Sequence, residues 1–87
     1  MEKSTFTREY EILRTLIREY REAGGLTQVE LAERIGETQS YVSKVERGER
    51  RLDLVQLRVF CEAMKVPCQE FVERFERGIN QQSSQVT

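Results

Sequence analysis

The stretch that most constrains the fold is residues 26–48, LTQVELAERIGETQSYVSKVERG. Thr27 and Glu30 have the spacing of a capping box, which predicts that a helix starts at Gln28. Gly36 is suited to end that helix, because glycine adopts a positive φ without steric cost. The first part of the stretch therefore predicts one short helix followed by a tight turn.

A second short helix is predicted directly after the turn. Thr38 can cap it, Gly48 can close it, and Val42 and Val45 face inward at i,i+3 spacing. Two short helices that cross steeply around a glycine-containing turn form a helix-turn-helix, and the second helix of such a motif is the kind that enters a DNA major groove. The core of the motif is predicted to consist of Val29, Leu31, Ala32, Ile35, Val42 and Val45.

The spacing of the motif resembles that of a known family. The chain reads G-L-T-Q-x-E-L-A-x-x-I-G at residues 25–36 and V-S-x-V-E-x-G at residues 42–48. This series resembles the Cro/lambda-repressor-like (XRE-type) helix-turn-helix transcriptional regulators, over a span from about Ile12 to Phe71. The resemblance implies an all-α fold, a compact five-helix DNA-binding domain. Phage-type repressors, restriction–modification controller proteins and antitoxins share this core.

Capping residues predict the helices on either side of the motif. Thr7 can cap a first helix that ends at Gly24 and Gly25, and Asp53 with Gln56 repeats the capping-box spacing for a fourth helix. The apolar surface of the fourth helix is predicted to come from Leu54, Leu57, Val59, Phe60, Cys61 and Met64.

A fifth helix is predicted to start at Pro67, whose missing N–H costs nothing at a first helical position, and to end at Gly78. Its apolar stripe is Cys68, Phe71, Val72, Phe75 and Ile79. The predicted organisation is an N-terminal arm over residues 1–6, one domain over residues 7–79 and a disordered polar tail over residues 80–87.

Charge and composition narrow the function. The net charge of the 87 residues is −1, but residues 38–51 carry Lys44 and three arginines against two glutamates, so the predicted recognition helix and the following loop are locally basic. The sequence has no histidine and only two cysteines, which argues against a metal centre, a cofactor site and an enzyme. No apolar run approaches a membrane span and no signal peptide is evident, so we expect a cytoplasmic protein with reduced thiols that serve as small apolar groups.

The start of the second helix is where DNA contacts are expected. Gln39 can pair with adenine N6 and N7, and Ser40, Ser43 and Lys44 extend the same helix face. Lys44 could reach a guanine or a phosphate, and Thr38 could contact DNA or act only as a cap. Gln28 lies at a helix N-terminus suited to a phosphate oxygen, and the resemblance implies that it clamps the DNA backbone.

Three arginines at the end of that helix are predicted to contact phosphates rather than to be ordinary solvated charges: Arg47, Arg50 and Arg51. The resemblance also implies an ion pair between Arg21 and Glu46 that ties the first helix to the third. Tyr41 departs from the small or polar residues often found at its position in the family. Its ring could stack on the DNA backbone or pack on the preceding helix.

The fifth helix suggests self-association. Its apolar stripe predicts a homodimer with Phe71, Phe75 and Ile79 at the interface, and small groove-binding domains commonly bind palindromic operators as dimers. An alternative is a protein-interaction module of the same fold, such as an antitoxin or an adaptor, in which a protein partner comes first and DNA binding is secondary.

Overall fold

The computed structural model of this chain describes the backbone of residues 7–86 and the side chains of residues 7–81. The predicted all-α class is confirmed, because these residues form five helices and no strand. The predicted arm, residues 1–6, lies outside the described residues. The helices are α1 (Arg8–Ala23), α2 (Gln28–Ile35), α3 (Gln39–Glu46), α4 (Leu54–Ala63) and α5 (Cys68–Val86).

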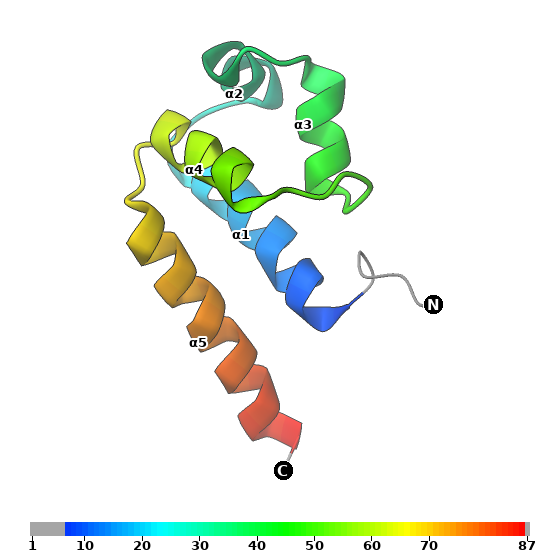
Figure 1. Cartoon of the computed structure of the whole chain (residues 1–87), viewed down its shortest axis with the longest axis vertical. Helices are drawn as coiled ribbons and strands as arrows, with labels where there is room; N and C mark the ends of the chain where they lie inside the picture. Colours follow the sequence, from blue (N-terminus) through cyan, green and yellow to red (C-terminus); the bar gives the residue numbers. More distant parts are fainter. Residues whose placement is uncertain (1–6, 87) are drawn as a thin grey trace.

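The helices form two groups (Figure 1). The long helices α1 and α5 run side by side in opposite directions, while α2 and α3 pack against each other at one end of the molecule. The α4 helix lies between the groups and contacts both α2 and α5, and α1 also contacts α3. Within the described residues, no helix combines the length and the apolar character needed to cross a membrane.

Local sequence signals place the helix ends. The Thr27 hydroxyl accepts from the Glu30 N–H at 3.0 Å, and the Glu30 carboxylate accepts from the Thr27 N–H at 2.9 Å. Asp53 and Gln56 make the same reciprocal pair at 2.7 and 2.9 Å. Gly36 ends α2 at φ 73°. These predictions are confirmed, and they matter because helices of this length need caps and tertiary packing to persist.

The core lies where the five helices meet, but it differs from the predicted set. Val29 was predicted to be buried and is 52% exposed, because the inner face of α2 is formed by Leu31 and Ala32. On α4, Leu54 and Val59 are 71% and 40% exposed, so part of its apolar surface faces solvent. The buried apolar residues are Leu16, Ile17, Leu26, Leu31, Ala32, Val42, Val45, Phe60, Cys61, Met64 and Phe71.

The α5 helix corrects two predictions about its ends. It starts at Cys68, one residue after Pro67, and it continues through Gly78 to Val86. A Cβ atom on Gly78 would lie 3.1 Å from Cγ2 of Ile12, so the glycine allows α5 to approach α1 closely instead of ending the helix. Residues 80–86, predicted as a disordered tail, continue the helix in this structure.

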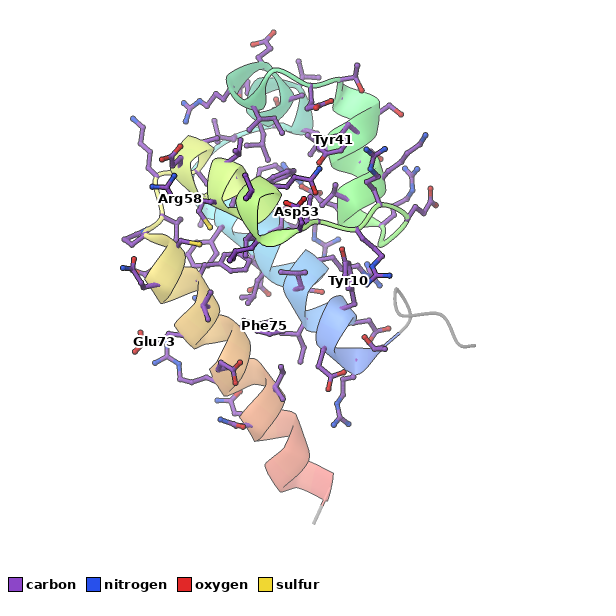
Figure 2. The ribbon with its side chains drawn as sticks, in the orientation of Figure 1. Tyr10, Tyr41, Asp53, Arg58, Glu73 and Phe75 are labelled. Carbon is purple, nitrogen blue, oxygen red and sulfur yellow. The ribbon has the colours of Figure 1, made fainter. Side chains whose placement is uncertain are left out.

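Part of the α5 stripe is used inside the chain. Phe71 is completely buried, and its ring lies 5.6 Å from that of Tyr20 on α1. It therefore offers no surface to a second copy, and its assignment to a dimer interface was wrong. Phe75 points from α5 toward α1 (Figure 2) and is half-buried, as is Ile79.

The two cysteines lie between α4 and α5. Both are free thiols, with Cys61 buried and Cys68 half-buried. Burial, with the neighbouring Cys68 as a further cause, raises the pKa of Cys61 to about 12. Cys61 is therefore an uncharged core group at neutral pH, as the sequence suggested.

We expect Gly36→Ala to destabilise the domain by about 1–2 kcal/mol, the usual cost of the left-handed conformation for a residue with a Cβ. No atom lies within 4 Å of the added Cβ, so the loss would reflect backbone strain alone. Urea denaturation measures the effect. Gly36→Asn is the matched control and should lose less, because asparagine tolerates this conformation. Equal losses for the two variants would contradict the explanation.

Candidate nucleic-acid interface

The site is built on a buried ion pair between α1 and α3. Arg21 donates from Nε to Oε2 of Glu46 at 2.6 Å and from Nη2 to Oε1 at 3.0 Å, and both residues are only 8% exposed. The Arg21 Nη1 group also donates to the Leu26 carbonyl at 2.8 Å. The hydrogen bond to Glu46 raises the pKa of Arg21, and the two parallel bonds have the bidentate geometry that suits an arginine and a carboxylate. The ion pair that the resemblance implied is present.

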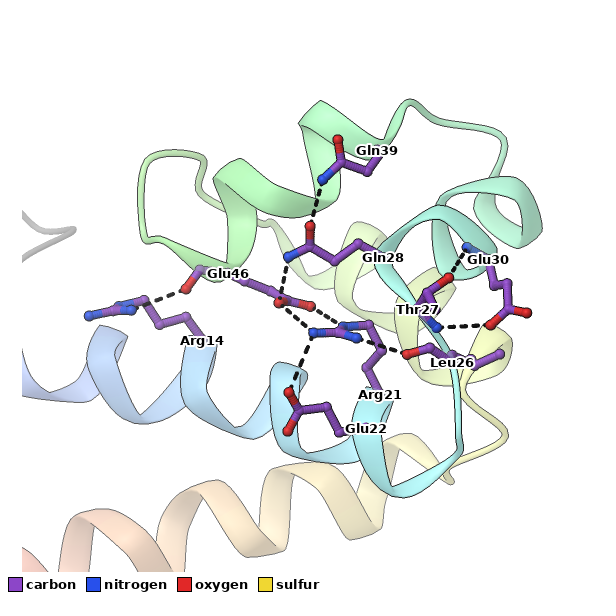
Figure 3. Close-up of polar contacts among 9 residues, drawn as sticks. All are labelled: Arg14, Arg21, Glu22, Leu26, Thr27, Gln28, Glu30, Gln39 and Glu46. Atoms are coloured by element: carbon purple, nitrogen blue, oxygen red, sulfur yellow. Dashed lines mark hydrogen bonds and ion pairs between the residues drawn. The ribbon is translucent and has the colours of Figure 1, made fainter.

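Two glutamines extend this pair toward the surface (Figure 3). Gln28 donates to Oε1 of Glu46 at 2.9 Å, and Gln39 donates to Oε1 of Gln28 at 2.6 Å. An ionised carboxylate only accepts, so Glu46 fixes which way the Gln28 amide is turned. The Gln28 oxygen must then face Gln39. The chain of four side chains connects the interior to the exposed start of α3.

The remaining residues predicted on α3 lie on or near the same surface. The Thr38 hydroxyl accepts from the Tyr41 N–H at 3.1 Å, so its capping role is confirmed. Ser40 and Lys44 are exposed, and Ser43 is half-buried. Whether any of them contacts DNA stays a prediction.

The three predicted phosphate-binding arginines have different surroundings. Arg47 makes two 3.1 Å contacts to the Glu49 carboxylate and donates to Ser43. This pairing raises the pKa of Arg47 and lowers the pKa of Glu49. The Arg50 guanidinium lies 5.1 Å from the centroid of the Tyr41 ring, and Arg51 is exposed. The charge of Arg47 is thus already balanced by a neighbour.

Tyr41 packs on α4, which is neither of its two predicted contacts, and whether it also contacts the DNA backbone stays a prediction. Its ring packs against Phe60 of α4, at 6.1 Å between centroids. Burial raises the pKa of Tyr41. Figure 2 shows Tyr41 between α3 and α4. The Arg50 guanidinium lies over the Tyr41 ring, at a distance suited to a cation–π contact.

Two contacts that the sequence did not predict hold the loop after α3. Tyr10 on α1 accepts at its hydroxyl from the Leu52 N–H at 2.7 Å, and Arg14 donates to the Glu46 carbonyl at 3.1 Å. These bonds fix both ends of the segment that carries Arg50 and Arg51. No local pattern in the sequence indicates a partner for the Tyr10 hydroxyl, because the loop that it holds lies 42 residues further along the chain.

A family model described as helix-turn-helix matches residues 17–71. This chain belongs to the helix-turn-helix family of the XRE type. The match includes α2, α3 and α4 completely, together with the part of α1 that supplies Arg21 and the start of α5.

Known proteins resemble the chain in sequence and structure. An uncharacterized HTH-type transcriptional regulator from Methanothermobacter thermautotrophicus is 49% identical over 43 residues, which cover 49% of this chain and 62% of that protein. The chain thus spans less than two thirds of that relative's length. An XRE-family like protein from Pseudomonas syringae pv. tomato is 40% identical with a TM-score of 0.75, over 79% of this chain and 84% of the other.

A third similar protein is the restriction–modification controller protein C.Esp1396I. Its wild-type structure is 25% identical with a TM-score of 0.78, over 84% of this chain and 96% of that one. The same controller protein has been solved as a tetramer in complex with its natural 35-base-pair operator.

We expect Glu46→Ala to lower the free energy of unfolding by about 3 kcal/mol, because it leaves the buried Arg21 charge without its carboxylate. Thermal and urea denaturation measure the loss. Glu49→Ala is the control, since it breaks only the exposed pair with Arg47 and should leave the melting temperature unchanged. An unchanged melting temperature for Glu46→Ala would show that the buried pair does not hold α3 in place.

Proposed function

We propose that this protein binds double-stranded DNA sequence-specifically as a small, dimeric transcriptional regulator, with α3 in the major groove. The observation that carries the proposal is the hydrogen-bonded chain from Arg21 through Glu46 and Gln28 to Gln39. It holds an otherwise flexible glutamine in one orientation at the exposed N-terminal end of α3. The N-terminal residues of a recognition helix are the ones that meet base edges.

The orientation of Gln39 suits adenine. One hydrogen of its Nε2 group is used on Gln28, which leaves the other hydrogen and the Oε1 atom to pair with adenine N7 and N6. The bond that Gln39 donates to Gln28 reduces the side-chain entropy that Gln39 would lose on binding. We therefore assign the main base contact to Gln39, with Ser40, Ser43 and Lys44 beside it.

The second N–H of Gln28 remains for a phosphate oxygen at the start of α2, where the helix dipole also favours an anion. Arg50 and Arg51 follow α3 on a loop that Tyr10 and Arg14 hold in position. We assign phosphate contacts to both. Arg47 would contribute less, because it must exchange Glu49 for a phosphate and loses one charge interaction as it gains another.

Dimerisation completes the proposal. Two α3 helices related by a two-fold axis would read half-sites one DNA turn apart, about 34–36 Å, which makes the operator palindromic. The controller protein of the same fold is known in complex with its operator as a tetramer, which supports both DNA binding and self-association here. Such a role would be exercised in the cytoplasm, and its control would depend on protein concentration or on a protein partner.

The salt dependence of DNA binding tests the phosphate contacts. The logarithm of the DNA-binding constant should fall linearly with the logarithm of the salt concentration. We expect Arg50→Ala and Arg51→Ala each to make this fall less steep, by about 1 unit of slope per lost phosphate contact. Arg47→Ala should lower it less. Arg77→Ala, on α5 and remote from α3 (Figure 1), is the control and should leave the slope unchanged. Fluorescence anisotropy with a duplex over a range of salt concentrations gives these slopes. A wild-type affinity independent of salt would favour the protein-interaction module.

Selection of bound duplexes from a random pool tests the base contact. We expect wild-type protein to enrich a palindrome, and Gln39→Ala to lose discrimination at one adenine in each half-site, by about 1–3 kcal/mol. Gln28→Ala should weaken binding and also relax that position, because it releases Gln39. The same enriched motif for wild type and Gln39→Ala would contradict the assignment of Gln39 as the base-reading residue.

A further inference from the structure

The outward face of α4 is unusually apolar for a solvated surface. Leu54 and Val55 are 71% and 72% exposed, and Val59 is 40% exposed, all within one helix of ten residues. Leu54 and Val55 lie away from the buried Phe60, which is 1% exposed, whereas Val59 lines a hollow beside Phe60 and Tyr41. Neighbouring large apolar side chains on the surface of a small domain mark an interaction site more often than scattered single ones.

This surface continues onto the start of α5. A groove of about 500 Å³ runs beside the α4 residues Leu54 and Arg58 to Val66, Pro67 and Cys68. A second hollow of about 330 Å³ adjoins it between Cys68 and Val72, and Val72 is itself 39% exposed. We call the exposed residues of α4 other than Val59, together with the groove residues beside them, the α4 face. Its members are Leu54, Val55, Arg58, Glu62, Val66 and Pro67.

We infer that the α4 face is the dimer contact and that a second copy of this chain occupies it. The inference rests on the proposed function, because a symmetric regulator needs such a contact. It assigns the dimer contact to α4 in place of the α5 stripe.

The charges of the α4 face are complementary to a second copy of the same face. Arg58 and Glu62 carry opposite charges one helical turn apart and form an exposed pair at 3.5 Å, with side chains 70% and 67% exposed. Suppose that two α4 helices cross antiparallel about a two-fold axis level with position 60. Arg58 of each copy then lies opposite Glu62 of the other copy, which gives two equivalent ion pairs. The same arrangement places Leu54 of one copy past the C-terminal end of α4 in the other copy, where Val66 and Pro67 line the groove. Such reciprocity is what a two-fold interface requires.

The position of α4 in the fold also favours this surface over the α5 stripe. Phe71 is buried, and Phe75 and Ile79 are half-buried, with Phe75 packed against the core. The α4 helix follows the loop that carries Arg50 and Arg51, so a contact there keeps two α3 helices close to one DNA face. The second half of α5 instead runs away from α3 (Figure 1). Arg58 extends outward from α4 (Figure 2).

Sedimentation equilibrium of the full chain, from about 10 to 100 µM, tests the inference. We expect the wild type to dimerise and Leu54→Asp to weaken dimerisation at least about 30-fold, the factor that corresponds to an interface hot spot. Circular dichroism checks that the variant is folded. Val29→Asp is the matched control, since Val29 is 52% exposed on α2, and it should leave the dimer unchanged.

A charge exchange makes the test independent of Leu54. Arg58→Glu and Glu62→Arg should each weaken dimerisation, because like charges then meet across the axis. An equimolar mixture of the two variants should restore a heterodimer, whereas a pair that acts only within one α4 helix predicts no restoration. A wild type that is a monomer both free and on a two-half-site duplex overturns the inference. So does a dimer that resists Leu54→Asp but is dissociated by Ile79→Asp.

Binding to a single half-site separates this inference from the proposed function. A folded, monomeric Leu54→Asp variant should retain wild-type affinity for a duplex that holds one half-site. Loss of the dimer with retained half-site binding supports the α4 face. If the wild type dimerises through this face but binds no duplex in a salt-dependent way, the proposed function fails while the interface stands.

Discussion

The interaction on which the rest of the structure depends is the buried pair of Arg21 and Glu46. Removing two charges from water is costly, and the cost is offset only when the geometry is good and the remaining polar atoms are hydrogen-bonded. Both conditions hold here, because Arg21 makes two bonds to the carboxylate and one to the Leu26 carbonyl, while Glu46 also accepts from Gln28. The pair joins α1 to the end of α3 and turns Gln28 toward Gln39.

The short helices α2 and α3 need the support of this ion pair to keep a fixed position. The α2 and α3 helices have eight residues each, a length at which isolated helices are unstable in water. Their caps satisfy the first N–H groups, and their inner faces bury Leu31, Val42 and Val45 completely or nearly so. Packing fixes where α3 lies, and the buried polar chain fixes how its leading glutamine is turned. In the proposed complex, affinity and specificity would draw on groups that are already ordered in the free protein.

Two parts of the molecular surface differ in charge and in polarity. The chain is slightly acidic overall, yet the segment of α3 and its following loop is basic, with Glu49 balancing Arg47 and Tyr41 supporting Arg50. The α4 face carries exposed apolar residues and one opposite-charge pair. One surface thus suits a polyanion and the other a copy of itself. The two surfaces are connected through the core, because Tyr41 of α3 packs against Phe60 of α4.

The sequence by itself determined the family and those helix ends that are set by local caps. Capping boxes at Thr27 and Asp53 and the left-handed glycine at Gly36 are local chemistry, and a local pattern is sufficient to predict them. The resemblance also implied the pair of Arg21 and Glu46. Only the tertiary structure decided that Gly78 lies against Ile12 inside a continuing helix, that Phe71 is buried against Tyr20, and that Val29 and Leu54 face solvent. Helical periodicity gives the side of a helix on which a residue lies, but which side is covered depends on how distant segments pack. The orientation of Gln39 depends on a chain of bonds across three helices, so no local signal could have given it.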